Sequence, residues 1–217
     1  MYRIPRIDCN VACPASLEEA FARTVRETVA CNNWPADFPY APQVGFRIFH
    51  TGADLLLRFD VAERCTAART LDDNGPVWTD SCAEFFFRPE GSDSYYNFEC
   101  NCIGTLLVGH RRDRTQAEHA PAEVLRTVRR RATYPHAPLP ETEGDNRWTL
   151  TLAIPAAALF RDRIAGWDGV QGAMNLYKCG DDLSCPHYLS WRPVGTPTPD
   201  FPRPEFFEPV FFEPKKQ

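Results

Sequence analysis

The chain has 217 residues, a length that suits one large β domain or two small ones and can bury a sizeable core without disulfide bonds. Its formal net charge is -5 and its basic residues are scattered apart from Arg129 to Arg131, which argues against nucleic acid as a partner. Twenty prolines, twelve glycines and fifteen phenylalanines indicate short strands and stiff loops rather than a helical bundle. We therefore expect a single all-β domain over residues 1–217.

No apolar run is long enough to span a membrane, and the first residues, MYRIPRID, lack the apolar core of a signal peptide. A leader could nevertheless have been removed, so localisation stays open. The nine cysteines fit no disulfide framework and are expected to be mostly reduced and buried. This favours a reducing compartment such as the cytoplasm, with the periplasm or cell surface as alternatives if a signal was trimmed.

Alternating apolar and polar residues predict short strands along most of the chain. In chain order, strands are expected at residues 1–13, 44–50, 54–63, 84–88, 95–102, 106–108, 125–133, 147–154, 172–179, 188–191 and 210–213. Their number and spacing predict an antiparallel β-sandwich with one or two short peripheral helices.

Helices and loops are predicted for a smaller number of segments than strands are. Ser16 and Glu19 form a capping-box pattern ahead of apolar residues at helical spacing, which predicts an amphipathic helix over residues 16–28. Helical turns are expected at residues 121–124 and after Pro155. Loops are expected where prolines, glycines or charges cluster, at residues 32–42, 110–120 and 136–146.

The stretch from Pro76 to Arg88, PVWTDSCAEFFFR, contains the first candidate site. Phe85 and Phe87 have the period of a strand face turned to a core, so Glu84 should point the other way. A carboxylate on an exposed strand face, six residues after Trp78, could begin a sugar site. The plainer alternative is a tryptophan in a corner of the core and a solvated glutamate.

Other strands also carry polar side chains opposite their apolar alternation. Together these positions are Glu84, Asn97, Glu99, Asn101, Asn175 and Tyr177. Any solvated sheet face is polar, but amides and carboxyl groups can also hydrogen-bond the vicinal hydroxyls of a sugar. Trp78 and Phe201 flank the row, and aromatic faces stack on the apolar face of a pyranose. The pattern therefore predicts a carbohydrate site.

Five segments resemble one protein family. They are PVWTDSCAEFFF, YYNFECNCIGT, NLYKCGDD, LSWRPVGTP and PEFFEPVFFE, and they are similar to the family 9 carbohydrate-binding modules, particularly their free-standing relatives in gut bacteria. The sharpest part of the resemblance is carried by Trp78, Asp80, Ser81, Glu84 and Phe86. The similarity covers nearly the whole chain and is loosest in the tail.

The resemblance implies a jelly-roll β-sandwich that binds glycan ends without catalysis, between two aromatic rings, in glycan capture or degradation. By resemblance, Trp78 matches one clamp tryptophan and Glu84 the sugar-binding glutamate. Phe201 stands where the family has its second clamp tryptophan, Glu99 where better-known members have an arginine, and Tyr177 where they have a glutamine. The glycan bound can therefore differ. Related modules can hold structural calcium, although no ligand set is matched here, and no other cofactor is expected.

Other functions remain open. Glu84 and Glu99 could be the paired carboxylates of a glycoside hydrolase, which stand roughly 5 to 9.5 Å apart depending on mechanism. An open sheet face would leave both solvated, without the burial that raises a pKa for acid catalysis, which argues against an enzyme. A haem-binding or partner-binding sandwich is a further alternative, but Met174 follows the inward alternation and is expected in the core.

Metal content and oligomeric state are open. Cys179, Cys185 and His187 could supply three metal ligands. Their spacing, C-x5-C-x-H, fits no known zinc pattern. The sequence offers no feature that fixes the oligomeric state.

Overall fold

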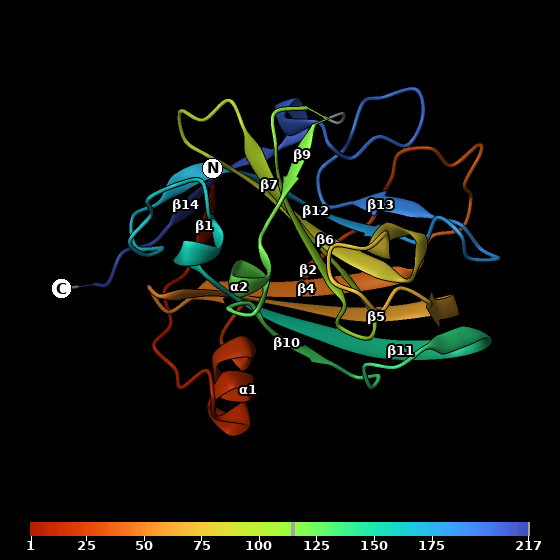
Figure 1. The fold of residues 1–217 in the computed structure, drawn as a ribbon, viewed down its shortest axis with the longest axis horizontal. Coiled ribbons are helices and arrows are strands. Elements are labelled where there is room, and N and C mark those ends of the chain that lie inside the picture. Colours follow the sequence, from red (N-terminus) through yellow and green to blue (C-terminus); the bar gives the residue numbers. More distant parts are fainter. Residues whose placement is uncertain (114–115, 217) are drawn as a thin grey trace.

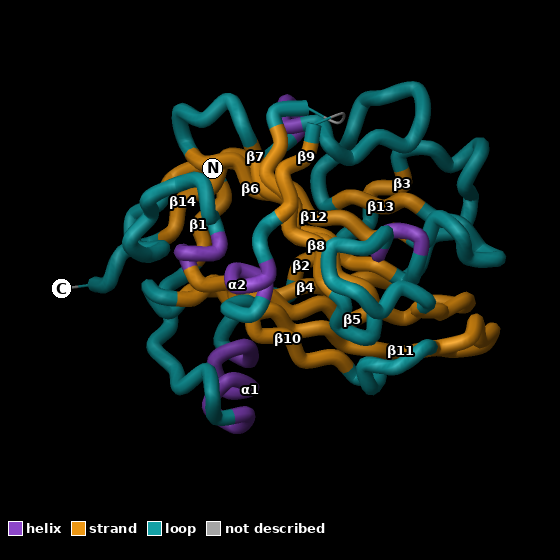
Figure 2. The backbone as a smooth tube through the Cα atoms, in the orientation of Figure 1, coloured by secondary structure: helices purple, strands orange, loops and turns teal. Residues whose placement is uncertain are grey.

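The computed structural model describes residues 1–113 and 116–216, and in it two β-sheets pack face to face (Figures 1 and 2). The larger sheet has the order β1 (Tyr2–Ile4), β14 (Glu208–Phe212), β12 (Gln171–Cys179), β6 (Cys82–Pro89), β7 (Tyr95–Asn101), β8 (Leu106–Arg111) and β9 (Ala117–His119). It also contains β13 (Tyr188–Ser190), which pairs with β12, and β3 (Cys31–Asn32), which pairs with β13. The smaller sheet has the order β10 (Arg129–Ala132), β11 (Leu139–Pro155), β5 (Asp54–Ala68), β4 (Gln43–His50) and β2 (Glu27–Thr28).

The antiparallel β-sandwich expected from the sequence is confirmed. Within the two sheets the named strands pair in antiparallel fashion, except that β1 pairs with β14 in parallel. The predicted loop at residues 110–120 is partly wrong, because β8 runs to Arg111 and β9 follows. Residues 114 and 115 of that predicted loop lie outside the described residues.

The core between the sheets follows the alternation of the strands. Leu55, Leu57, Phe59 and Val61 of β5 are buried there, as expected for its inward face. Met174 lies in the same core with no exposed surface. Its position confirms the core assignment and leaves its sulfur unavailable to a haem.

The helices are few and peripheral. Helix α1 (Pro14–Ala22) packs on the outer face of the smaller sheet, with Phe21 against Phe49 (Figure 1). The predicted capping box is wrong, because the Ser16 hydroxyl accepts a bond from the backbone N–H of Asn10 and the helix already begins at Pro14.

The backbone is already a strand at β2 (Glu27–Thr28), so the predicted helix over residues 16–28 is also too long. The β-branched residues near Val25 favour extended backbone. The expected helical turns are confirmed as α2 (Ala122–Leu125) and the 3₁₀ turn η2 (Ala156–Ala158). None of the described helices has the length and apolar character to cross a membrane.

Residues 139–146 of the loop predicted over residues 136–146 are instead the first half of β11, whereas residues 136–138 lie outside any strand as expected. This half pairs with the end of β5, which continues five residues beyond the predicted end at Glu63. Two register shifts interrupt this pairing. On its other side, β11 pairs with β10 only from Leu150 onward. Pro140 therefore stands on a free strand edge, where its missing N–H costs no ladder hydrogen bond.

A second apolar layer covers the outer face of the larger sheet. It includes Phe86 and Tyr177 from the strands, Trp34 from the loop at residues 32–42, and Phe201 and Phe207 from the tail. Trp34 donates its indole N–H to the carbonyl of Thr196, 2.7 Å away, so that loop holds the tail in place. The outer face therefore has walls of its own, rather than being open to solvent.

Candidate functional site

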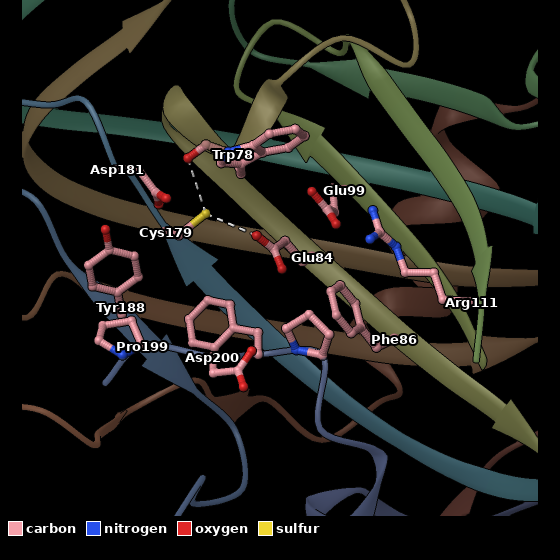
Figure 3. A pocket seen from close by; sticks show the side chains of 12 residues that line it. Trp78, Glu84, Phe86, Glu99, Arg111, Cys179, Asp181, Tyr188, Pro199 and Asp200 are labelled. Carbon is pink, nitrogen blue, oxygen red and sulfur yellow. Dashed lines mark hydrogen bonds between the residues drawn. The ribbon is translucent and has the colours of Figure 1, made fainter. Parts of the chain in front are cut away.

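A cleft of about 270 Å³ lies on the outer face of the larger sheet (Figure 3). It is lined by Trp78, Glu84, Phe86, Glu99, Arg111, Cys179, Asp181, Tyr188, Pro199, Asp200, Phe201 and Pro202. Its volume is just below the roughly 300–1,000 Å³ of typical small-molecule sites. It is therefore sized for a small ligand or for the end of a longer one.

The floor of the cleft comes from the central strands β12, β6 and β7. Glu84 on β6 is directly opposite Glu99 on β7 and Tyr177 on β12. Since successive side chains alternate, Glu84 shares the outer face with Phe86 while Phe85 enters the core. The strand pattern recognised in the sequence thus places both carboxyl groups on one floor.

Trp78 stands on a turn above this floor. It belongs to the 3₁₀ turn η1 (Val77–Thr79) and is 36% exposed. Asp80 fixes the turn, because its carboxylate accepts the backbone N–H groups of Arg69 and Thr70 at 2.9 and 3.0 Å. The Trp78 carbonyl in turn accepts the N–H of Asp181. The indole is thus held rigidly while one part of its surface faces solvent.

Phe201 contributes another aromatic wall, but a mostly buried one. It is only 8% exposed, and its ring stacks on Tyr177 with 4.3 Å between centroids and 17° between planes. The Tyr177 hydroxyl donates to the Phe201 carbonyl at 3.1 Å. The ring centroids of Trp34 and Tyr188 lie 6.0 and 6.1 Å from the centroid of the Phe201 ring. Phe201 therefore offers the cleft a small, rigid apolar surface.

The expectation that the two glutamates lie on an open, solvated face is wrong. Glu84 is 3% exposed and Glu99 is 7% exposed, because Trp78, Tyr188 and the tail enclose them. Burial, followed by the neighbouring charge of Glu99, raises the pKa of Glu84 well above its ordinary value. The Cys179 thiol donates to Glu84 Oε1 at 2.9 Å. Burial therefore favours the protonated, neutral form of the Glu84 carboxyl group.

Glu99 is held on its other side by polar partners. Asn97 donates its side-chain N–H to Glu99 Oε1 at 2.6 Å, and Arg111 donates to the Asn97 side-chain oxygen at 3.1 Å. Burial raises the pKa of Glu99 to about 7, against the lowering effects of the Asn97 bond and the Arg111 charge. The raised pKa values favour the protonated forms of both carboxyl groups, which share the cleft floor (Figure 3).

The structure brings four of the seven predicted site residues to the cleft, namely Trp78, Glu84, Glu99 and Phe201. Tyr177 lies behind Phe201 rather than in the lining. Asn101 donates to the Thr70 carbonyl and to Asp80, and accepts the backbone N–H of Thr105. Asn175 donates to the Arg192 carbonyl and accepts the Arg192 N–H. These amides are engaged in holding loops against the sheet.

Sequence reasoning missed several polar lining residues, chiefly Arg111, Asp181, Tyr188 and Asp200. Arg111 reaches the cleft because β8 continues past the predicted end at Val108. Extending the strand alternation to Arg111 would have found it, since it is opposite Tyr95, two residues from Asn97. Asp181 and Asp200 sit on long connections and carry no local signal of proximity.

The described residues contain one group that could share a metal ion, formed by Cys82, Glu84 and Cys179, whose ligand atoms lie within 4.8 Å of one another. Two sulfurs do not suit calcium, which takes oxygen ligands. Burial raises the pKa of both thiols, so this group is a neutral, hydrogen-bonded part of the cleft floor. His187, which the sequence offered as a possible metal ligand with Cys179 and Cys185, lies with its Nε2 2.7 Å from Lys178 Nζ.

Comparisons with known proteins bear on the fold and the family. The sequence profile of carbohydrate-binding family 9 matches residues 13–212. A Bacteroides uniformis protein, described as a candidate carbohydrate-binding protein and solved at 2.70 Å, is 39% identical to this chain. The match covers 97% of this chain and 98% of that one, with a TM-score of 0.91. None of the curated proteins compared matches the chain.

More distant structures share the fold alone. A family 9 carbohydrate-binding module from Caldicellulosiruptor kristjanssonii has been solved in complex with glucose, with a TM-score of 0.58 at 8% identity, covering 99% of this chain and 96% of that one. Its complex with cellotriose gives 0.59 at 7% identity, covering 99% and 94%. The profile match over residues 13–212, together with the 39% identical Bacteroides uniformis protein, shows that the chain belongs to carbohydrate-binding family 9.

Proposed function

We propose that the protein binds carbohydrate without catalysis and holds a sugar, or the end of a glycan, in the cleft between Trp78 and Phe201. The observation that carries this proposal is that Trp78, Glu84, Glu99 and Phe201, which are far apart in the sequence and were predicted from it to form one site, line one cleft. Family membership supports it, as do the glucose and cellotriose complexes of the Caldicellulosiruptor module.

The chemistry of the floor suits sugar hydroxyls. A protonated Glu84 can donate one hydrogen bond and accept others, while Glu99 and Arg111 add an acceptor and a donor. The exposed part of the Trp78 indole supplies a stacking surface for the apolar face of a pyranose. Because such a small, polar site competes with water, we expect dissociation constants of about 0.01–1 mM.

Isothermal titration calorimetry against mono- and oligosaccharides tests the proposal. Loss of the stacking surface in Trp78→Ala should weaken binding about tenfold. Leu71→Ala is the matched control, because Leu71 is similarly exposed at 37% but is outside the cleft lining. Absence of binding across the sugars, or equal binding by wild type and Trp78→Ala, would contradict the proposal.

A glycoside hydrolase is the second candidate, and one observation favours it. Glu84 and Glu99 are cross-strand neighbours, whose Cβ atoms stand about 5 Å apart in such a pair, and both are buried with raised pKa values. A raised pKa, as on Glu84, would suit a general acid.

Turnover separates the two functions. Incubation with chromogenic glycosides and oligosaccharides should release no product if the protein only binds. Hydrolysis that is abolished in both Glu84→Gln and Glu99→Gln would instead establish the enzyme. Sugar binding that survives either substitution, with no turnover by wild type, supports the binding function.

A further inference from the structure

A pair of cysteines outside the cleft has its sulfur atoms in contact. Cys65 lies in β5, and Cys185 lies in the segment at residues 180–187 that joins β12 to β13. Their Sγ atoms are 2.7 Å apart, and the residues are 1% and 5% exposed. A disulfide bond is about 2.0 Å long, so a movement of about 0.7 Å would join the two sulfurs.

The environment of the pair favours thiol chemistry. The Arg64 guanidinium donates to the Cys185 sulfur through two nitrogens, at 2.6 and 3.1 Å. A cation beside a cysteine stabilises the thiolate, which is the reactive form. The Arg64 side chain is 57% exposed, so the positive side of Cys185 is also the side that solvent reaches.

Another cysteine pair in the chain lies beside a carboxyl group rather than a guanidinium. Cys82 and Cys179 are directly opposite in β6 and β12, with the carboxyl group of Glu84 beside them. Burial raises the pKa of both thiols; burial and the Cys185 bond also raise the pKa of Cys65, to about 11, but there the Arg64 bond acts in the opposite direction. The Cys65–Cys185 pair is thus distinguished by the neighbouring Arg64 guanidinium, whose side chain is exposed to solvent.

We propose that Cys65 and Cys185 are a site of reversible oxidation that forms a disulfide in the presence of a peroxide. The Cys185 thiolate attacks hydrogen peroxide and becomes a sulfenic acid, with hydroxide as the leaving group. The Cys65 sulfur then attacks the Cys185 sulfur and water leaves. In sum, two thiols and one hydrogen peroxide give one disulfide and two waters, and a dithiol reductant reverses the change.

The disulfide fixes a wall of the cleft. The segment at residues 180–187 carries Asp181 and runs into Tyr188, both of which line the cleft. Its present attachments include the backbone bond from Ser184 to the Glu141 carboxylate at 2.8 Å. A covalent link to β5 would add a fixed point on the opposite sheet. Any effect on sugar affinity rests on the proposed function, whereas formation of the disulfide does not.

Peptide mapping tests the proposal directly. The reduced protein is treated with hydrogen peroxide, remaining thiols are alkylated, and the protein is digested without reduction. The expected product is a disulfide-linked pair of peptides containing Cys65 and Cys185, which disappears after dithiothreitol. Cys65→Ser and Cys185→Ser should lose it, whereas Cys9→Ser, which changes a half-buried thiol elsewhere, should keep it.

Kinetics provides the second readout. In Arg64→Gln, disulfide formation should be about tenfold slower than in wild type, because the thiolate loses its cation. Failure to find the linked peptides, a product joining Cys82 to Cys179 instead, or an unchanged rate in Arg64→Gln would each overturn the proposal. Sugar affinity that is equal in the oxidised and reduced forms would overturn only the effect on the cleft.

Discussion

Glu84 on β6 and Glu99 on β7 are directly opposite each other, and their carboxyl groups share the buried floor of one cleft. Two buried acids side by side resist ionisation, because each loses hydration and each ionised group repels the other. Burial raises the pKa of both, further for Glu84 than for Glu99. The pair of carboxyl groups therefore carries less than its full double negative charge near pH 7, and this has consequences for stability and binding.

Stability should fall as the pH rises through the titration of Glu99. Its pKa is raised from 4.5 to about 7, so the folded protein holds this proton more tightly than the unfolded chain does. This difference between the pKa values in the folded and unfolded states corresponds to at most about 3 kcal/mol of folding stability, which is lost between about pH 4.5 and pH 7. Glu99→Gln should equal wild type near pH 4.5 and exceed it above pH 8 in urea unfolding. Parallel pH profiles would contradict this.

Glu84→Gln should preserve sugar binding at pH 7. Because the raised pKa favours the protonated form of Glu84, glutamine has the charge of that form, and its oxygen can still accept the Cys179 thiol. We expect an affinity within about threefold of wild type by calorimetry, and a loss of about tenfold in Glu84→Ala, which removes the hydrogen bonds. A large loss in Glu84→Gln would instead mean that the ionised carboxylate is the binding form.

Tyr177 should act on binding through Phe201. Tyr177→Phe removes the bond to the Phe201 carbonyl and should cost about 1 kcal/mol in the free energy of unfolding. Tyr177→Ala also removes the stacked ring, so we expect a loss of about 3–5 kcal/mol and a weaker sugar affinity. Urea unfolding and calorimetry measure the two effects.

The control for the tyrosine series is Tyr95→Phe. The buried Tyr95 hydroxyl has no hydrogen-bond partner among the described residues, so its removal should leave stability unchanged or raise it. If Tyr177→Phe and Tyr95→Phe had equal effects, the Tyr177 hydroxyl would not be supporting the wall.

The sequence predicts best what depends on strand alternation. Phe85 in the core and Glu84 on the other face follow from a period of two residues, and so does the inward face of β5. Such positions are fixed within one strand and need no knowledge of distant segments. Phe201 was a candidate from its aromatic side chain alone, and the family resemblance added its role as the counterpart of Trp78, which no local pattern could have supplied.

Burial of the site depended on contacts between distant segments, and here prediction from the sequence failed. Glu84 reads as a solvated residue because Tyr188 and Phe201, which help to enclose it, are more than one hundred positions further along the chain. Arg111 was missed because its strand continues beyond the apolar run. The pairing of β11 with the end of β5 was likewise hidden by Pro140, which only a free strand edge tolerates.

A buried ion pair at the other side of β12 provides the last prediction. Lys178 Nζ lies 2.8 Å from Glu63 Oε2, neither side chain is exposed, and the Trp148 indole donates to Glu63 Oε1 at 2.6 Å. Burial alone would raise the pKa of Glu63, but the Lys178 charge, the neighbouring His187 and the bonds from Lys178 and Trp148 together outweigh it and lower that pKa, so Glu63 is ionised. Lys178→Met would leave an unpaired buried carboxylate, and we expect a loss of about 3–5 kcal/mol at pH 7 by urea unfolding. Adding Glu63→Gln should recover more than half of it, because the amide keeps the Trp148 bond without a charge.

Arg147→Met, which breaks the exposed pair with Asp145, should cost less than about 1 kcal/mol. A loss that small in Lys178→Met, or no recovery in the double variant, would show that the pair is not needed to offset a buried charge.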